Sequence, residues 1–248
     1  MNEKTNVLLT GATSGIGLAI GKLLASHGYQ VYGLGRQTQK VGTLPESFFL
    51  FSCDITDDAA LAECLSSIRR QMPDGCPDIV IHCAGVGYYG LHETLSRRQL
   101  RELVATNLEA PMVLTSLLLP TMKKRRSGHF IFLSSVTAES SNPHGCAYGA
   151  TKAALSSFAK SLFEEVRKTN IKVTTLQPDM TMTDLYRNAD FTAEETACLF
   201  PEDVADAVWS VLHQPAHCNI SMMTLKPQLH RIRKKQIAKY LSEDSHYE

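Results

Sequence analysis

Three glycines near the amino end set the strongest limit on the fold. Gly11, Gly15 and Gly17 directly follow a short apolar run at residues 6–10, and a helical pattern begins at Ile16. A turn without Cβ atoms lets the backbone approach a phosphate, and a helix amino terminus adds N–H donors and the positive end of its dipole. The spacing is G-x-x-x-G-x-G, and glycines alone are compatible with a purely structural turn. Strand, glycines and helix in this order predict a dinucleotide-binding loop.

Short β-rich runs alternate with helical patterns along the whole chain. We expect strands at residues 6–10, 30–34, 47–53, 79–83, 129–134, 172–176 and 220–225. We expect helices at residues 16–27, 57–72, 97–126 with a break near Pro111, 147–167 and 202–213. Most strand runs are apolar throughout, as strands covered on both faces are. The alternation predicts a parallel sheet with helices on both sides.

One domain over residues 1–248 is expected, because no linker or repeat interrupts the pattern. Residues 183–201 have no strong period and are the candidate substrate loop. Residues 228–241 are basic and loosely amphipathic, which predicts a helix that packs on the domain or on a neighbouring subunit. The 25 basic and 25 acidic residues balance, so nothing points to nucleic acid as a partner.

The cysteines and the apolar runs indicate a protein of the cytoplasm. Seven cysteines are scattered without a C-x-x-C pair, which is typical of reduced thiols, and no ligand cluster suggests a metal site. The amino end has no apolar signal region, and no unbroken apolar run reaches the ~18 residues of a membrane span.

A tyrosine and a lysine stand four residues apart, at Tyr148 and Lys152. On a helix this spacing places both side chains on one face. A phenol has a free pKa of about 10, and a nearby ammonium favours the phenolate. The pair therefore predicts an oxygen acid or base that works near neutral pH. Each residue alone is more often packing or solvated surface, as is Ser135 at the end of a strand run.

The ends of the second and third strand runs carry residues suited to a phosphorylated dinucleotide. Arg36 stands where an NAD-binding protein usually places an acid, and a guanidinium attracts a 2′-phosphate. This favours NADP(H) over NAD(H), the alternative being a solvated surface arginine. Asp54 follows the third strand run, where it either accepts a hydrogen bond from adenine or caps a helix.

Taken together, these motifs resemble the single-domain branch of the short-chain dehydrogenase/reductase family over about residues 6–225. The segments that carry the resemblance are Thr10 to Gly17, Asp54, His82-Cys83-Ala84-Gly85, Asn107, Ser135, Tyr148 to Lys152, and Pro178 to Thr183. The expected fold is a Rossmann-like, doubly wound, mostly parallel seven-stranded sheet in the order 3-2-1-4-5-6-7. The resemblance implies a homodimer or homotetramer, with the helix at residues 147–167 on the dimer face.

The resemblance also implies a role for each site residue. Ser135 would stabilise the substrate oxygen, Tyr148 would exchange a proton with it, and Lys152 would lower the pKa of Tyr148 and hold the nicotinamide ribose. Asn107 would position a water that relays protons. The implied cofactor-binding residues are Gly11, Thr13, Ser14, Gly15, Ile16, Gly17, Arg36, Asp54, Ile55, Cys83, Ala84, Gly85, Tyr148, Lys152, Pro178, Thr181 and Thr183.

Three residues depart from the family pattern. Ala110 replaces a common glycine three residues after Asn107, and the other two lie near the expected site. Cys83 stands where asparagine is common, and Asp179 replaces the glycine after Pro178. The expected function is hydride transfer between NADP(H) and a ketone, an aldehyde or a secondary alcohol. The rival is a non-catalytic NADP(H)-sensing protein of the same fold. A nucleotide-sugar epimerase or dehydratase usually needs a longer substrate domain than the chain after Pro178 provides.

Overall fold

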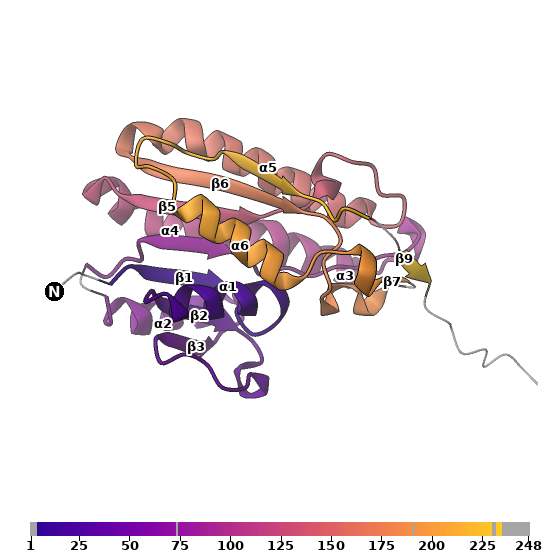
Figure 1. Ribbon diagram of the computed structural model, residues 1–248, viewed down its shortest axis with the longest axis horizontal. Coiled ribbons are helices and arrows are strands. Elements are labelled where there is room, and N and C mark those ends of the chain that lie inside the picture. Colours follow the sequence, from indigo (N-terminus) through magenta and orange to yellow (C-terminus); the bar gives the residue numbers. More distant parts are fainter. Residues whose placement is uncertain (1–3, 73, 190, 230–231, 235–248) are drawn as a thin grey trace, which may run out of the picture.

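Seven parallel strands form the central sheet of the computed structural model (Figure 1), which describes residues 4–72, 74–189, 191–229 and 232–234. The strands are β1 (Asn6–Thr10), β2 (Gln30–Gly35), β3 (Phe48–Ser52), β4 (Ile79–His82), β5 (Gly128–Leu133), β6 (Ile171–Pro178) and β8 (Met222–Leu225). Their order is β3-β2-β1-β4-β5-β6-β8. The expected fold class and strand order are confirmed. The expected seventh strand is β8, because a short strand, β7 (Phe191–Ala193), precedes it.

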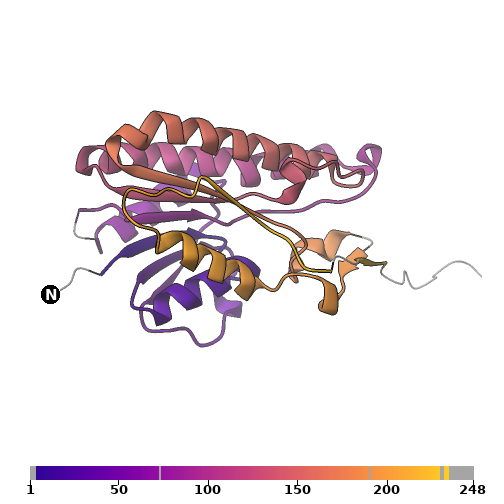
Figure 2. The same ribbon diagram turned by 45° about the horizontal axis from the view of Figure 1, so that its top comes forward.

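Helices cover both faces of the sheet, as Figure 2 shows. Helices α1 (Gly15–Ser26) and α6 (Pro201–Leu212) lie on one face, and α2 (Asp58–Arg69), α4 (Ala110–Arg125) and α5 (Cys146–Val166) lie on the other. Alternate residues of β1 serve the two cores: Val7 and Leu9 pack with α1 and α6, whereas Leu8 packs with the helices opposite. Burial on both faces explains why the strands are apolar throughout.

The long helix expected at residues 97–126 is interrupted before Pro111. Helix α3 (Arg97–Val104) passes into a π-helical turn, Ala105–Glu109, and then into α4. Pro111 lies in the first turn of α4, where the backbone N–H that proline lacks is not needed for a hydrogen bond within the helix. By length and composition, Arg97–Arg125 is the one helix among the described residues that could cross a membrane. Leu114, Leu118 and Met122 of this stretch are buried against the sheet, which makes it a core helix.

The chain beyond β6 differs from the expectation in two places. The candidate substrate loop contains short elements: 3-10 turns at Asp184–Asn188 and Glu195–Ala197, with β7 between them. The helix expected at 228–241 is wrong where the structure describes it, because β9 (Ile232–Lys234) is a strand antiparallel to β7. Pairing with the edge of β7 satisfies backbone groups that a three-residue strand would otherwise leave open. Residues 230–231 and 235–241 of the expected helix lie outside the described residues.

Candidate active site

The glycine turn after β1 packs so closely that side chains would not fit. Gly11 has a φ of +71°, and a Cβ there would come within 2.8 Å of the Ala84 Cα. A Cβ on Gly17 would lie 2.2 Å from the carbonyl oxygen of Gly11. The hydroxyl oxygen of Thr10 accepts hydrogen bonds from the backbone N–H groups of Cys83 and Ala84, each at 3.1 Å. These contacts hold the turn against the end of β4 and bring both segments to one edge of the sheet.

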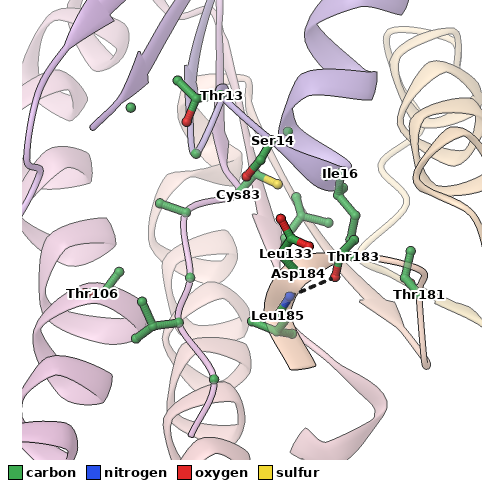
Figure 3. A pocket seen from close by; sticks show the side chains of 18 of the residues that line it. Thr13, Ser14, Ile16, Cys83, Thr106, Leu133, Thr181, Thr183, Asp184 and Leu185 are labelled. Carbon is green, nitrogen blue, oxygen red and sulfur yellow. Dashed lines mark hydrogen bonds between the residues drawn. The ribbon is translucent and has the colours of Figure 1, made fainter. Parts of the chain in front are cut away.

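A pocket of about 430 Å³ opens at the carboxyl ends of the strands, beside this turn. Every cofactor-binding residue expected from the sequence lines it, and Figure 3 labels Thr13, Ser14, Ile16, Cys83, Thr181 and Thr183 among them. Ser14 is the N-cap residue of α1 but makes no side-chain capping bond. The N–H groups of the first helical turn therefore remain available for an anion in the pocket.

Two cations and one carboxylate lie at the β2 and β3 end of the pocket. Arg36 is about half exposed, and its Nη1 lies 3.9 Å from Oε1 of Glu102. Lys40, in the 3-10 turn after β2, also lines the pocket and was missed from the sequence; the available signal was a second cation four residues after Arg36. Asp54 accepts hydrogen bonds from the backbone N–H and the hydroxyl of Thr56, at 3.0 and 2.7 Å. Burial works to raise the pKa of Asp54, but these bonds and the Arg36 guanidinium bring it below its ordinary value.

The triad predicted from the sequence is brought together at the other end of the pocket. Tyr148 and Lys152 lie on the first turns of α5, and each is 5% exposed. The Lys152 Nζ lies 5.7 Å from the centre of the Tyr148 ring and donates a hydrogen bond of 2.8 Å to the carbonyl oxygen of Leu133. Ser135 follows β5, and its hydroxyl acts to lower the pKa of Tyr148. All three side chains line the same pocket as the glycine turn.

The two adjacent serines have different surroundings. The Ser135 Oγ accepts hydrogen bonds from the backbone N–H and the hydroxyl of Thr137, at 3.2 and 3.0 Å, so its own hydrogen can point to Tyr148. Ser134 instead donates to the carbonyl oxygen of Lys152 at 2.9 Å and lies 2.8 Å from the hydroxyl of Ser156. Both serines line the pocket, but the Ser134 hydroxyl is used to tie β5 to α5, whereas the Ser135 hydroxyl makes no bond to α5 in the hydrogen bonds described.

The pKa values in the site correct one expectation. Burial raises the pKa of Tyr148 above its ordinary value and Tyr186 adds to this effect, whereas hydrogen bonds with Ser135 and Tyr89 lower it. Burial also lowers the pKa of Lys152 to about 8. The sequence predicts that Lys152 lowers the pKa of Tyr148, but the net direction in the structure is upward. Burial is the largest cause of this shift. The Lys152 ammonium is bonded to a backbone carbonyl and is itself only partly charged near pH 8.

Asn107 lies behind the pocket wall and is completely buried within the π-helical turn. Its Oδ1 accepts from the backbone N–H of Val86 at 2.8 Å, and its Nδ2 donates to the carbonyl oxygen of Val86 at 3.0 Å and to the Thr151 hydroxyl at 3.2 Å. The amide thus joins the loop after β4 to α5. The expected water relay at Asn107 stays a prediction.

Residues of the expected substrate loop close the far side of the pocket. Those that line it are Thr183, Asp184, Leu185, Tyr186 and Arg187. Thr183 caps the 3-10 turn by accepting the backbone N–H of Leu185 at 3.4 Å, as the dashed line in Figure 3 shows. Asp179, the departure noted in the sequence, lines the pocket as well, and its Oδ1 accepts a hydrogen bond from the backbone N–H of Met180 at 2.7 Å.

Comparison of the sequence with known families and proteins gives extensive matches. The family model described as short chain dehydrogenase matches residues 5–193. An uncharacterized oxidoreductase of Staphylococcus epidermidis is 31% identical over 231 residues, which are 92% of this chain and 98% of the relative. The NADP-dependent 3-hydroxy acid dehydrogenase YdfG of Escherichia coli K12 is 30% identical over 236 residues, with 89% of this chain and 94% of the relative covered.

Solved structures agree with these matches. The serine dehydrogenase from Escherichia coli superposes with a TM-score of 0.78 at 29% identity, over 90% of this chain and 98% of that one. The closed form of serine dehydrogenase complexed with NADP⁺ has a TM-score of 0.79 at 27% identity, with 90% and 95% covered.

Proposed function

The chain belongs to the short-chain dehydrogenase/reductase family, and from this premise we propose that it transfers a hydride between NADP(H) and a ketone, an aldehyde or a secondary alcohol. One observation carries the proposal: Ser135, Tyr148 and Lys152 line the same pocket as the glycine turn. That arrangement puts a proton-exchanging hydroxyl beside a cradle for a dinucleotide.

The residues of the pocket fit NADP(H). Gly11 and Gly17 give the turn a backbone without side chains next to the start of α1, where a pyrophosphate would bind. Arg36 and Lys40 supply positive charge where β2 ends, and Asp54 offers an acceptor where β3 ends. The preference for NADP(H) over NAD(H) rests on these two cations. It is supported by YdfG, which is NADP-dependent, and by the NADP⁺ complex of serine dehydrogenase.

In this proposal NADP(H) supplies or accepts the hydride, and the chain's own residues orient and polarise the substrate. Ser135 donates a hydrogen bond to the substrate oxygen and stabilises its developing negative charge. Tyr148 gives that oxygen a proton during reduction and takes one during oxidation. Lys152 holds the nicotinamide ribose, and its charge opposes the effect of burial on the Tyr148 phenolate. Thr181 and Thr183 lie on the segment after β6, where they would orient the carboxamide.

The proposal is tested by a cofactor-oxidation assay over a panel of ketones and aldehydes, and by the reverse assay with L-serine and 3-hydroxybutanoate as alcohols. These two probes are the kinds of alcohol after which the related serine dehydrogenase and 3-hydroxy acid dehydrogenase are named. Tyr148→Phe is expected to abolish turnover and to leave NADPH binding largely unchanged. If this variant kept most of the wild-type rate, the role of Tyr148 would be refuted. Tight NADPH binding without turnover of any compound would instead favour the rival, a non-catalytic NADP(H) sensor.

We further propose a homodimer or homotetramer in the cytoplasm. Val104, Met112 and Leu117 are apolar and at least two-fifths exposed on the α3–α4 stretch, which offers a surface for a second copy. All seven cysteines are free thiols, as expected in a reducing compartment. Sedimentation that found only monomer would contradict the proposed oligomer. Fractionation of the protein to an oxidising compartment would contradict the proposed cytoplasmic location.

A further inference from the structure

An ion pair joins the β2 end of the pocket to helix α3. The Nη1 atom of Arg36, just after β2, lies 3.9 Å from Oε1 of Glu102 on α3. The Arg36 side chain is 54% exposed and that of Glu102 is 32% exposed, so water screens the pair only in part. Arg36 lines the pocket, whereas Glu102 is not among the residues that line it. Glu102 therefore stands behind Arg36 as seen from the pocket.

The Glu102 carboxylate is held by a second neighbour. The hydroxyl of Tyr88, on the loop after β4, donates a hydrogen bond of 2.6 Å to Oε2. Leu103, the next residue of α3, is completely buried and anchors the helix beneath. Tyr88 and Arg36 thus hold one carboxylate oxygen each, and both of these neighbours line the pocket. The carboxylate is kept beside the guanidinium by contacts that do not depend on a bound cofactor.

A 2′-phosphate at this end of the pocket would use the same guanidinium. Arginine binds a phosphate through its N–H groups and its charge, and the Glu102 carboxylate already neutralises part of that charge. Pairing with Glu102 therefore weakens the attraction of Arg36 for the phosphate of NADP(H). NAD(H) carries a hydroxyl at the same position, so its binding does not depend on this charge. The ion pair thus acts on the preference between the two cofactors.

We propose that Glu102 is a positioning residue that limits the preference for NADP(H): it holds Arg36 at the rim of the pocket and moderates the attraction of Arg36 for the 2′-phosphate. The protein therefore binds NADPH less tightly than Arg36 and Lys40 alone would allow. The inference rests on the proposed use of NADP(H). It adds the residue on α3 that sets how strongly this cofactor is preferred.

The variant Glu102→Gln separates this role from packing. The amide has the size of the carboxylate, and its oxygen can still accept the hydrogen bond from Tyr88, so only the charge is removed. Glu164→Gln is the matched control, because Glu164 also pairs with an arginine: its Oε2 lies 2.9 Å from Nε of Arg167 at the far end of α5. Glu164 does not line the pocket. Both variants lose one negative charge and one exposed arginine ion pair.

Fluorescence titration with NADPH and with NADH measures the two affinities. In Glu102→Gln the NADPH affinity is expected to rise about three- to fivefold, which is the effect of one exposed ion pair, while the NADH affinity is unchanged. The gain should shrink at high salt, because screening weakens an exposed pair. In Glu164→Gln both affinities should equal those of the wild type. An NADPH affinity that is unchanged or lower in Glu102→Gln would overturn the proposal, as would an equal gain for NADH.

A double-mutant cycle with Arg36→Ala distinguishes this inference from the proposed cofactor site. Because Glu102 acts through Arg36, adding Glu102→Gln to Arg36→Ala should largely abolish the gain in NADPH affinity. A gain of the same size in the double variant would refute action through Arg36. If Arg36→Ala weakened NADPH and NADH binding equally, the proposed 2′-phosphate contact would fail together with this inference. A selective loss of NADPH binding in Arg36→Ala, with no gain in Glu102→Gln, would refute only the role of Glu102.

Discussion

The Nζ atom of Lys152 donates a hydrogen bond of 2.8 Å to the carbonyl oxygen of Leu133, so the end of β5 holds the ammonium of α5 at the pocket wall. The partner is neutral, and the lysine is only 5% exposed. Burial of a charge without a counter-ion disfavours the charged form, and the pKa of Lys152 falls to about 8. The site therefore holds its cation at a cost in folding stability.

Lys152→Met is expected to be inactive but at least as stable as the wild type at pH 7. The folded-state pKa lies below the unfolded value of about 10.4, so the unfolded chain binds more protons between pH 8 and 10. Wild-type stability should rise with pH in that window by up to about 1.4 kcal/mol per pH unit relative to the variant. Urea unfolding of both proteins at several pH values measures this difference. A large loss of stability at pH 7 would show that the bond to Leu133 outweighs burial.

The NADP(H) preference leads to a prediction about Arg36. Its ion pair with Glu102 is long and exposed, so Arg36→Ala should cost little stability. Loss of the guanidinium should weaken NADPH binding by about 10- to 100-fold and leave NADH binding unchanged. Arg70→Ala is the control, because Arg70 is exposed at the end of α2 and its guanidinium donates a hydrogen bond to the Ser66 hydroxyl at 3.1 Å. Fluorescence titration with both cofactors measures the ratio, and equal weakening of both would contradict a 2′-phosphate contact.

The sequence predicts the parts of the site that depend on local pattern. Gly11 and Gly17 form a turn between neighbouring elements. Tyr148 and Lys152 are four residues apart on one helix, so they share a face. Both groups could therefore be placed from spacing alone. Features that need contacts between distant segments could not be placed. Lys40 enters the pocket through a turn with no periodic signal, and β9 exists only because β7 offers an edge across about forty residues of chain.

The pKa of Tyr148 illustrates the same limit. Spacing places a lysine beside it, but the direction of the shift is set by burial, and Tyr186 adds to the shift from another part of the chain. The sign of an electrostatic effect thus depends on desolvation, which a sequence pattern does not contain.

A buried histidine predicts how stability depends on pH. The His82 ring is stacked on Phe132 with centres 4.6 Å apart, and its Nε2 lies 3.1 Å from the Thr115 hydroxyl. Burial lowers the pKa of His82 to about 3. The unfolded state therefore binds more protons between pH 3 and about 6.5, and this contribution to stability is full above pH 6.5 and is lost as the pH falls.

His82→Phe is expected to be less stable than the wild type at pH 7.5 by about 1 kcal/mol, because the bond with Thr115 is lost. The gap should close or reverse by pH 5, since the phenyl ring takes up no proton. Urea unfolding at both pH values measures it. A gap for His82→Phe that is constant with pH would mean that His82 does not resist protonation.

The hydrogen bonds of Asn107 have a close structural match elsewhere in the chain. Asn219 bonds to Val173 just as Asn107 bonds to Val86: its Oδ1 accepts the backbone N–H at 3.1 Å and its Nδ2 donates to the carbonyl oxygen at 3.0 Å. Asn219 joins the segment before β8 to β6 and does not line the pocket. Replacing either asparagine with alanine removes two backbone hydrogen bonds, at an expected cost of about 2–4 kcal/mol.

Only Asn107→Ala should also impair turnover. A Cβ on Gly85 would lie 3.4 Å from the Asn107 Oδ1 and 3.5 Å from the Lys152 Nζ, so the amide and the ammonium meet at the same pocket-lining residue. Loosening this loop should lower kcat by more than about tenfold in Asn107→Ala, whereas kcat of Asn219→Ala should stay within about twofold of the wild type. Urea unfolding and steady-state kinetics at a temperature where both variants are folded measure the two effects. Equal losses of stability with equal kcat values would reduce Asn107 to a purely structural residue.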